Sequence, residues 1–319
     1  MSIHRYSTLL YKFFLLISIM PTIGANYYVA TSYGSDSNNG NSINTPFKTI
    51  GKAASVMSSG DKCYIRQGRY HETITIDDLD GSSGSAIVFT NYNNERVVID
   101  GTTPITSTWT RVGSTNIWKT KLSADIWQLF INWEEQVMAR WPNAKFSDDT
   151  IWDNDNYWAK GTIDDDENAY TNGTIIDDPY TNSAGTAVDL NATGFDLDET
   201  NKQAIAILNL GSFKTWSRLV TSHSGNTFNY ATVPTWKTKH HYYYLEGRKE
   251  FLDQEGEWWY DTYNNADSLY YYAANGVNPN RLDFRGKVQS YAFSITGSQY
   301  VQIKNLEFFA TTVYFSNGD

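Results

Sequence analysis

The sequence predicts an all-β protein in which short strands stack into coils. Aromatic residues, which favour strands, are abundant, with 23 Tyr, 15 Phe and 11 Trp in 319 residues. Short runs that alternate apolar and polar residues recur throughout, while a helical period is convincing only at residues 45–60. The early strands, marked by Ile65, Ile76, Phe89 and Ile99, follow one another at intervals of ten to thirteen residues. Irregular coils without a strict sequence repeat predict a parallel β-helix.

Residues 1–25 predict a secretory signal peptide. His4, Arg5 and Lys12 give a positive start, the apolar run FFLLISIM follows, and small residues lead to Ala25. The run is too short to span a bilayer, so no membrane span is expected. Cleavage near Ala25 predicts an extracellular or periplasmic protein, and the loss of Arg5 and Lys12 changes the net charge from −10 to −12.

An amphipathic helix is predicted at residues 45–60. We expect Thr45 as its N-cap and Pro46 as its first helical residue. Apolar residues recur at steps of three or four positions, at Phe47, Ile50, Ala54 and Met57. Because a β-helix has an exposed hydrophobic end, we expect this helix to cap the first coil. The single cysteine, Cys63, lies in the next alternating run and is expected to be a small buried hydrophobe.

The middle of the chain predicts an inserted antiparallel β-domain. Acidic residues are dense from Asp148 to Glu199, where Lys160 is the only basic residue, and the strand-like runs AIAILNL, FKTWSRLVT and HHYYYLEG follow. The chain stops at Asp319 after a strand with no closing cap, so we expect it to be truncated. The predicted parts are the signal peptide, the cap with the first coils, the insert, and an incomplete return to the β-helix, at residues 1–25, 26–139, 140–247 and 248–319.

Several stretches resemble one protein family. YYVATSYGSDSNNGNSINTPFKTIGKAASVMSSGDKCYIRQGRYHETI resembles the N-terminal start of secreted right-handed parallel β-helix proteins of the pectate-lyase-like superfamily. ARWPN and LDQEGEWWYDTYNNADSLYYYAANGVNPN resemble a glycan-active subset with an inserted β-domain, and YAFSITGSQYVQIKNLEFFATTVYF resembles a rung of the main helix. The resemblance implies a carbohydrate-active protein, but this superfamily holds lyases, hydrolases, esterases, epimerases and adhesins alike.

The charge of the chain favours hydrolysis of a neutral glycan. A glycoside hydrolase needs two carboxyl groups that face one groove, whereas a lyase needs Lys or Arg, with calcium, to neutralise a uronate. A mature charge of −12 repels a polyuronate, although salt screens this beyond about 10 Å. We therefore predict a secreted glycoside hydrolase acting on an extracellular polysaccharide. A polysaccharide lyase of the same fold and a non-catalytic glycan-binding or adhesin β-helix remain the alternatives. We expect a monomer and no nucleic-acid partner.

Substrate contacts are predicted at Trp258, Trp259, Arg140 and Trp141. The two neighbouring tryptophans lie in a block where alternate residues face opposite ways, so some side chains should be exposed as platforms for sugar rings. A structural role at the junction between the insert and the coils is the competing interpretation for all four residues. No catalytic residue is assigned, because we expect the catalytic coils beyond Asp319 and no turnover by this chain alone.

No cofactor or metal site is predicted, although calcium would accompany a lyase. The loop GSDSNNGN departs from the order of a calcium loop at Gly40. His240 and His241 would point to opposite faces of a strand. Other charged or modifiable positions are expected to be solvated or host-dependent: the run Asp164 to Glu167, the alternating charges Asp283, Arg285 and Lys287, and the sequons at Asn172 and Asn191.

Overall fold

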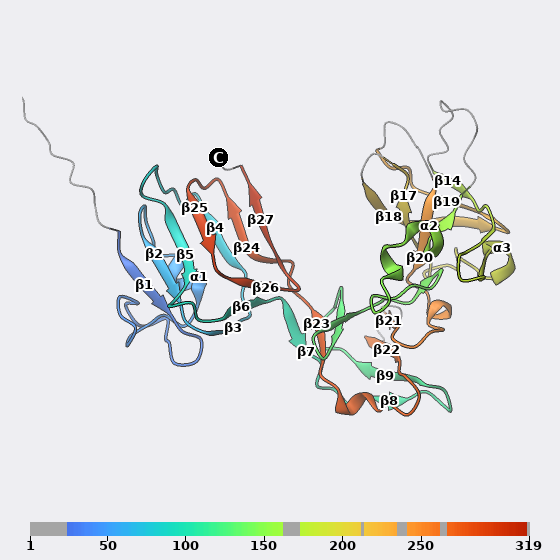
Figure 1. Ribbon diagram of the computed structural model, residues 1–319, viewed down its shortest axis with the longest axis horizontal. Coiled ribbons are helices and arrows are strands. Elements are labelled where there is room, and N and C mark those ends of the chain that lie inside the picture. The colour runs from blue at the N-terminus through green and yellow to red at the C-terminus, as the bar shows by residue number, and fades with distance from the viewer. Residues whose placement is uncertain (1–23, 162–172, 212–213, 235–240, 262–266, 318–319) are drawn as a thin grey trace, which may run out of the picture. The chain divides into compact units, whose positions relative to one another are not determined.

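The chain is all-β and divides into two compact units. The computed structural model describes residues 24–161, 173–211, 214–234, 241–261 and 267–317 (Figure 1). Unit 1 comprises residues 1–99, 291–308 and 312–319, and unit 2 comprises residues 100–290 and 309–311. Nearly all of the predicted signal peptide lies outside the described residues, as do the run Asp164 to Glu167, His240 and Asn172.

The described part of unit 1 is built on three sheets. In the first, β1 (Asn26–Val29), β2 (Lys62–Ile65), β5 (Ile87–Asn91) and β25 (Val301–Lys304) pair in that order, all in parallel. The second has the order β26 (Glu307–Phe309), β6 (Val97–Asp100) and β3 (Gly68–Tyr70), and the third has the order β27 (Thr312–Ser316), β24 (Tyr291–Thr296) and β4 (Ile74–Asp77). The pairs β3–β6, β4–β24 and β24–β27 are also parallel.

The chain visits these three sheets in a fixed rotation. Strands β2, β3 and β4 belong to the first, second and third sheet, and β5 and β6 begin the rotation again. After unit 2, β24 resumes it in the third sheet, and β25, β26 and β27 complete another round. Segments more than 200 residues apart in sequence therefore lie side by side in unit 1, as β4 and β24 do (Figure 1).

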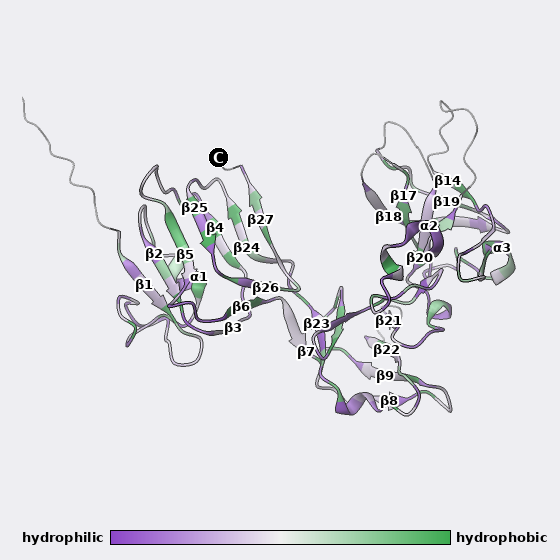
Figure 2. Cartoon of the chain, in the orientation of Figure 1, coloured by the Kyte–Doolittle hydropathy of each residue, from purple (hydrophilic) through white to green (hydrophobic). Residues whose placement is uncertain are grey.

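The core of unit 1 follows the predicted alternation. Cys63, Ile65, Phe89 and Ile99 are fully buried in one cluster, and Figure 2 shows the hydrophobic character of β5 within it. Burial raises the pKa of the Cys63 thiol above its ordinary value, so this residue behaves as a small hydrophobe, as predicted.

The predicted helix is shorter than expected and begins later. Helix α1 spans Ile50–Ala54, and Thr49 caps it by accepting a hydrogen bond from the Lys52 backbone N–H at 3.1 Å. The predicted N-cap at Thr45 and first helical position at Pro46 are wrong, because the chain at Phe47 bonds to β1 instead of entering a helix: the Phe47 N–H donates to the Tyr28 carbonyl at 2.8 Å. The apolar stripe itself is buried, with Phe47, Ile50, Ala54 and Met57 all packed in the core of unit 1.

Unit 2 is built on antiparallel sheets. One has the order β11 (Glu134–Gln136), β10 (Leu129–Ile131), β23 (Phe284–Lys287) and β7 (Thr102–Pro104). Another has the order β21 (Trp258–Asp261), β22 (Ser268–Tyr272), β9 (Ile117–Lys121) and β8 (Thr110–Arg111). A small pair joins β15 (Tyr180–Thr181) to β16 (Ala187–Val188).

The largest sheet of unit 2 has seven strands. Its order is β12 (Arg140–Trp141), β20 (Tyr242–Glu246), β17 (Ile205–Asn209), β18 (Thr215–Ser224), β19 (Thr227–Tyr230) and β14 (Thr174–Ile176), and β13 (Ala159–Lys160) also pairs with β20. All seven strands come from the range 140–247 that the sequence predicts as an insert, whereas the two units divide at 99/100 and 290/291.

Short helices complete unit 2. They are η1 (Thr150–Trp152), α2 (Asn154–Tyr157), α3 (Leu190–Thr193), η2 (Lys249–Phe251) and η4 (Pro279–Arg281). No helix in the described residues is long and apolar enough to cross a membrane.

Candidate functional site

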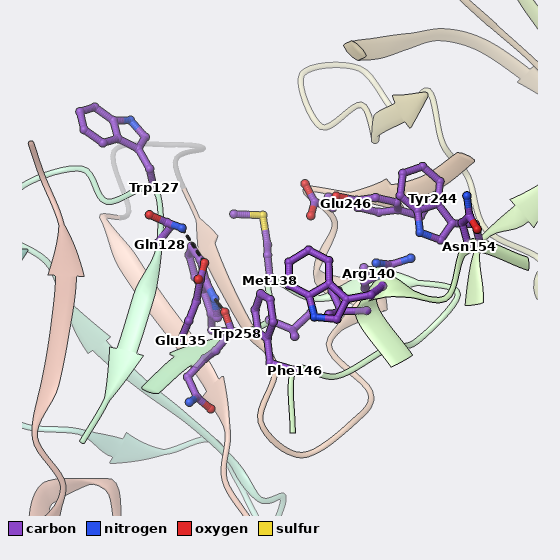
Figure 3. Close-up of a pocket in the computed structure, with 15 residues that line it drawn as sticks. Trp127, Gln128, Glu135, Met138, Arg140, Phe146, Asn154, Tyr244, Glu246 and Trp258 are labelled. Carbon is purple, nitrogen blue, oxygen red and sulfur yellow. Dashed lines mark hydrogen bonds between the residues drawn. The ribbon is translucent and has the colours of Figure 1, made fainter. Parts of the chain in front are cut away.

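A cavity of about 420 Å³ lies within unit 2. Figure 3 shows carboxyl, amide and aromatic side chains around it. Its walls come from the segment 127–158 together with β20 and the start of β21. The lining residues are Trp127, Gln128, Glu135, Gln136, Val137, Met138, Arg140, Phe146, Ile151, Trp152, Asn154, Trp158, Tyr244, Glu246 and Trp258.

Arg140 forms part of the cavity wall and is fixed by the backbone. Its side chain is buried, its Nε donates to the Pro142 carbonyl at 2.9 Å, and one terminal nitrogen donates to the Tyr157 carbonyl at 2.9 Å. The guanidinium carbon lies 3.7 Å from the centre of the Tyr244 ring, which is a cation–π contact. Burial lowers the pKa of Arg140 to about 10, so the group stays charged at neutral pH.

Glu246 is one of two acidic residues that line the cavity. It lies directly across the sheet from Arg140 in the antiparallel pairing of β12 with β20. Burial raises the pKa of Glu246 to about 7, although the nearby Arg140 guanidinium favours its ionised form. Its carboxyl group makes no hydrogen bond to another described residue and points into the cavity (Figure 3). Glu246 can therefore donate or accept a proton near neutral pH.

A second carboxyl group lies on the other side of the cavity. Glu135 is on β11 and accepts a hydrogen bond from the Gln128 Nε2 amide at 2.6 Å. Figure 3 shows this pair on one side of the cavity and Glu246 with Arg140 on the other. The space between the two sides is flanked by Met138 and Phe146. A ligand in this cavity would meet polar groups at two sides and apolar surface between them.

The aromatic residues of the cavity give it exposed flat surfaces. Trp127 is 53% exposed and Trp152 is 73% exposed, which is unusual for residues of this size. Trp152 lies against Phe146 with ring centres 6.0 Å apart, and Trp158 meets Tyr244 edge-on at 4.7 Å. Exposed aromatic faces beside hydrogen-bonding groups suit the apolar faces and hydroxyl groups of sugar rings.

The four predicted substrate-contact residues lie in different surroundings in this structure. Arg140 and Trp258 line the cavity, whereas Trp259 and Trp141 belong to the hydrophobic cluster around the seven-stranded sheet. Trp258 is 1% exposed and Trp259 is 7% exposed, so neither tryptophan of this pair is one of the exposed side chains expected in the block. The reason is that β21 is covered on both faces, with Trp258 in one core cluster and Trp259 in another.

A second cavity of about 720 Å³ shares four lining residues with the first, Glu135, Gln136, Val137 and Phe146. Its walls include three more glutamates, Glu134, Glu255 and Glu257. In the described part of the chain, no three His, Cys, Asp or Glu side chains are grouped closely enough to hold a metal ion.

The structure also shows the burial of the charged and modifiable residues named in the sequence analysis. The expectation that Arg285 is solvated is wrong: it is buried because it donates to the Thr102 hydroxyl at 2.8 Å and to Asp100 at 3.3 Å at the start of β7. Asp283 is exposed and Lys287 is half-buried. His241 is buried, and Asn191 is exposed in α3.

Sequence reasoning missed Glu246, Glu135, Trp127 and Trp152. One usable signal was present: in the run YYYLE, Tyr242, Tyr244 and Glu246 alternate with buried Tyr243 and Leu245. This pattern places an acid and two aromatic rings on one strand face.

Comparisons with known proteins point to a shared fold. No family model matches the chain. An uncharacterized protein of Bacillus subtilis, YwoF, is 40% identical over 76 residues, which cover 24% of this chain and 16% of YwoF. A solved structure described as a glycoside hydrolase is similar with a TM-score of 0.57 and 16% identity, over 89% of this chain and 50% of that one. A structure described as XylC in complex with xylose has a TM-score of 0.43 and 17% identity, over 90% and 36% of the two chains. The chain thus spans half the length of the solved glycoside hydrolase whose fold it shares.

Proposed function

We propose that this protein is a secreted, carbohydrate-active protein with a right-handed parallel β-helix capped by α1, and that it hydrolyses an extracellular polysaccharide. In this proposal the 420 Å³ cavity of unit 2 binds the sugar. The observation that carries the proposal is the combination, in one cavity, of exposed Trp127 and Trp152 with the free carboxyl group of Glu246. The fold shared with a solved glycoside hydrolase supports it.

The chemistry of the cavity suits a neutral glycan. Trp127 and Trp152 offer stacking faces, Gln128 and Asn154 offer amides, and Glu246 offers a carboxyl group that is half protonated at about pH 7. The protonated carboxyl donates a hydrogen bond to a sugar hydroxyl or glycosidic oxygen, and the ionised form accepts one. A glycoside hydrolase also requires a second carboxyl group, and Glu135 lines the same cavity.

A lyase is less well supported by this cavity. Its chemistry requires a cation that is free to neutralise the carboxylate of a uronate. Among the described residues that line the cavity, Arg140 is the only Lys or Arg, and its hydrogen bonds go to the Pro142 and Tyr157 carbonyls. Because the Arg140 guanidinium donates to these backbone carbonyls, it stabilises the cavity wall and is not free to neutralise a uronate.

A non-catalytic glycan-binding protein is the second candidate, because the aromatic surfaces alone support binding. Binding and turnover must therefore be measured separately. We would test a panel of neutral and uronate polysaccharides by affinity electrophoresis, and by release of reducing sugar and of unsaturated products. We expect binding to a neutral glycan, and we expect the Trp127→Ala and Trp152→Ala variants each to weaken it about tenfold, because one stacking platform is worth about 1–2 kcal/mol.

Tyr33→Ala is the matched control, since Tyr33 is 51% exposed and is not among the residues that line this cavity. Unchanged binding in both tryptophan variants would contradict the assignment of the cavity. Binding without release of any product would favour either the glycan-binding protein or the prediction that the catalytic coils lie beyond Asp319, and unsaturated products would favour the lyase.

A further inference from the structure

The second cavity of unit 2, of about 720 Å³, has an acidic wall, and we call it the acidic cavity. Glu134 and Glu135 line it from β11, and Glu255 and Glu257 line it from the turn that precedes β21. Lys145, which is half-buried, is the only basic residue among its described lining residues. Four carboxyl groups and one ammonium group make this cavity favourable for a positively charged ligand.

Hydrogen bonds hold the two acidic segments together. The Trp258 backbone N–H donates to the Val137 carbonyl at 3.1 Å, and the Trp258 indole Nε1 donates to the Gln136 carbonyl at 3.0 Å. Gly256, with a φ of 91°, turns the chain just before β21, and a Cβ at this glycine would lie 3.9 Å from the Gln136 Oε1. The end of β11 and this turn are therefore close neighbours, which places the acids of both segments on one cavity.

Glu257 gives the acidic cavity an unused hydrogen-bond acceptor. It is 1% exposed, and its Oε2 accepts hydrogen bonds from the backbone N–H groups of Asp253 and Gln254, both at 3.1 Å. Its Oε1 is buried and has no hydrogen-bond partner among the described residues. Because buried polar atoms normally have a partner, the Glu257 Oε1 favours a ligand that supplies a donor. A carboxyl group keeps this acceptor capacity in its ionised and in its protonated form.

A primary ammonium group fits these acceptors. It carries three N–H donors, so it can bond to Glu257 and to an exposed carboxylate at the same time. Glu134 and Glu255 are exposed and supply such carboxylates. The glutamates of this cavity do not form a metal-ligand set, since no three His, Cys, Asp or Glu side chains in the described part of the chain are grouped closely enough for one.

We propose that the acidic cavity binds an amine-bearing sugar of a glycan, with Glu134 and Glu255 attracting its ammonium group and the Glu257 Oε1 accepting a hydrogen bond from it. The acidic cavity shares four lining residues with the sugar cavity, so one glycan can extend from the tryptophan platforms into it. The position of that next ring rests on the proposed function. Stacking on Trp127 and Trp152 does not depend on charge, whereas the glutamates select a sugar with a free amine.

The test compares β-1,4-linked hexamers of glucosamine and of N-acetylglucosamine, which share a backbone but differ in the charge on each nitrogen. Binding to the full chain is measured by isothermal titration calorimetry at about pH 6, where the amine is protonated, and at about 0.15 M salt. We expect the glucosamine hexamer to bind more tightly. The double variant Glu134→Gln with Glu255→Gln should weaken this binding about fivefold, because each exposed ion pair contributes modestly, and should leave binding of the N-acetylglucosamine hexamer unchanged.

The matched control is the double variant Asp77→Asn with Asp283→Asn, which removes the same charge at two exposed positions that line neither cavity. Equal loss of binding in both double variants would overturn the proposal, since only net charge would then matter. Equal affinity for the two hexamers would also overturn it. Binding of spermine as tight as that of the glucosamine hexamer would overturn the choice of a sugar, because the amines alone would then account for the affinity. Circular dichroism checks that each variant is folded.

The tryptophan variants separate this proposal from the proposed function. If Trp127→Ala and Trp152→Ala leave the binding of both hexamers unchanged while the double glutamate variant weakens that of the glucosamine hexamer, the acidic cavity binds the amine and the assignment of the sugar cavity is wrong. If the tryptophan variants weaken the binding of both hexamers and the double glutamate variant weakens neither, the sugar cavity is right and the acidic cavity does not select the amine.

Discussion

Replacing Glu257 by Gln should stabilise unit 2 at alkaline pH and remove much of the pH dependence of its unfolding. Glu257 is 1% exposed. Its Oε2 accepts hydrogen bonds from the backbone N–H groups of Asp253 and Gln254, both at 3.1 Å. Its buried Oε1 has no hydrogen-bond partner among the described residues. Glutamine has nearly the same shape and keeps an oxygen that accepts both backbone hydrogen bonds, but it carries no charge.

The size and sign of the effect follow from the protonation of Glu257. Burial raises its pKa from the ordinary 4.5 to about 8, while the backbone amides only partly oppose this. Below pH 4.5 the group is protonated in both the folded and the unfolded chain. Between pH 4.5 and 8 unfolding releases the proton, so the free energy of unfolding falls as the pH rises. At about 1.4 kcal/mol for each pKa unit, wild type should lose up to about 5 kcal/mol by pH 8.

The assay is urea unfolding followed by tryptophan fluorescence at pH 5 and at pH 9. All eleven tryptophans lie between residues 109 and 259, so the signal reports on unit 2. Wild type should lose several kcal/mol more than Glu257→Gln between the two pH values. Glu255→Gln is the matched control, since Glu255 is a neighbouring acid with an exposed side chain. If wild type and Glu257→Gln lose stability equally, the carboxyl group is not buried in the way described.

Two further changes test other parts of the molecule. Ile50→Asp should lower the melting temperature of unit 1 sharply, by the equivalent of about 3 kcal/mol or more, because it buries a charge without a partner. The control Val56→Asp, at a position that is 39% exposed, should have little effect. Equal melting temperatures of the two variants would show that α1 does not cover the core. Glu246→Gln should flatten the pH dependence of neutral-glycan binding between about pH 6 and pH 8, because the wild-type carboxyl titrates near 7; binding that varies with pH as in wild type would exclude Glu246 from the sugar contact.

Much of unit 1 could be predicted because the alternation of apolar and polar residues along each strand is a local property of the sequence. The alternation around Cys63, Ile65 and Phe89 is short-range, and the structure buries each of these residues. The start of the helix could not be placed, because Phe47 is held by backbone pairing with β1. The residues before α1 that periodicity places in its first turn are therefore not helical, and the backbone contact of Phe47 with β1 could not be read from the local sequence.

The candidate site of unit 2 was predicted only in part, because the strand pairing that assembles it joins segments that are far apart in the sequence. ARWPN indicated Arg140, but the partner Glu246 lies 106 residues later and faces it only through the pairing of β12 with β20. Which side chains of the aromatic block around Trp258 and Trp259 are exposed could not be predicted for a related reason. Alternation shows that neighbours on a strand face opposite ways, but it does not show whether each face is covered by protein.

Arg140 links the stability of the cavity wall to the chemistry of its acid. A buried guanidinium is tolerated here because its donors reach the Pro142 and Tyr157 carbonyls and its flat face lies on Tyr244. The same charge favours ionisation of Glu246, whereas burial opposes it, and the balance leaves the pKa of Glu246 at about 7. Without Arg140, burial alone would raise that pKa further. Sequence positions that fix the wall therefore also set the pH range in which Glu246 can exchange a proton.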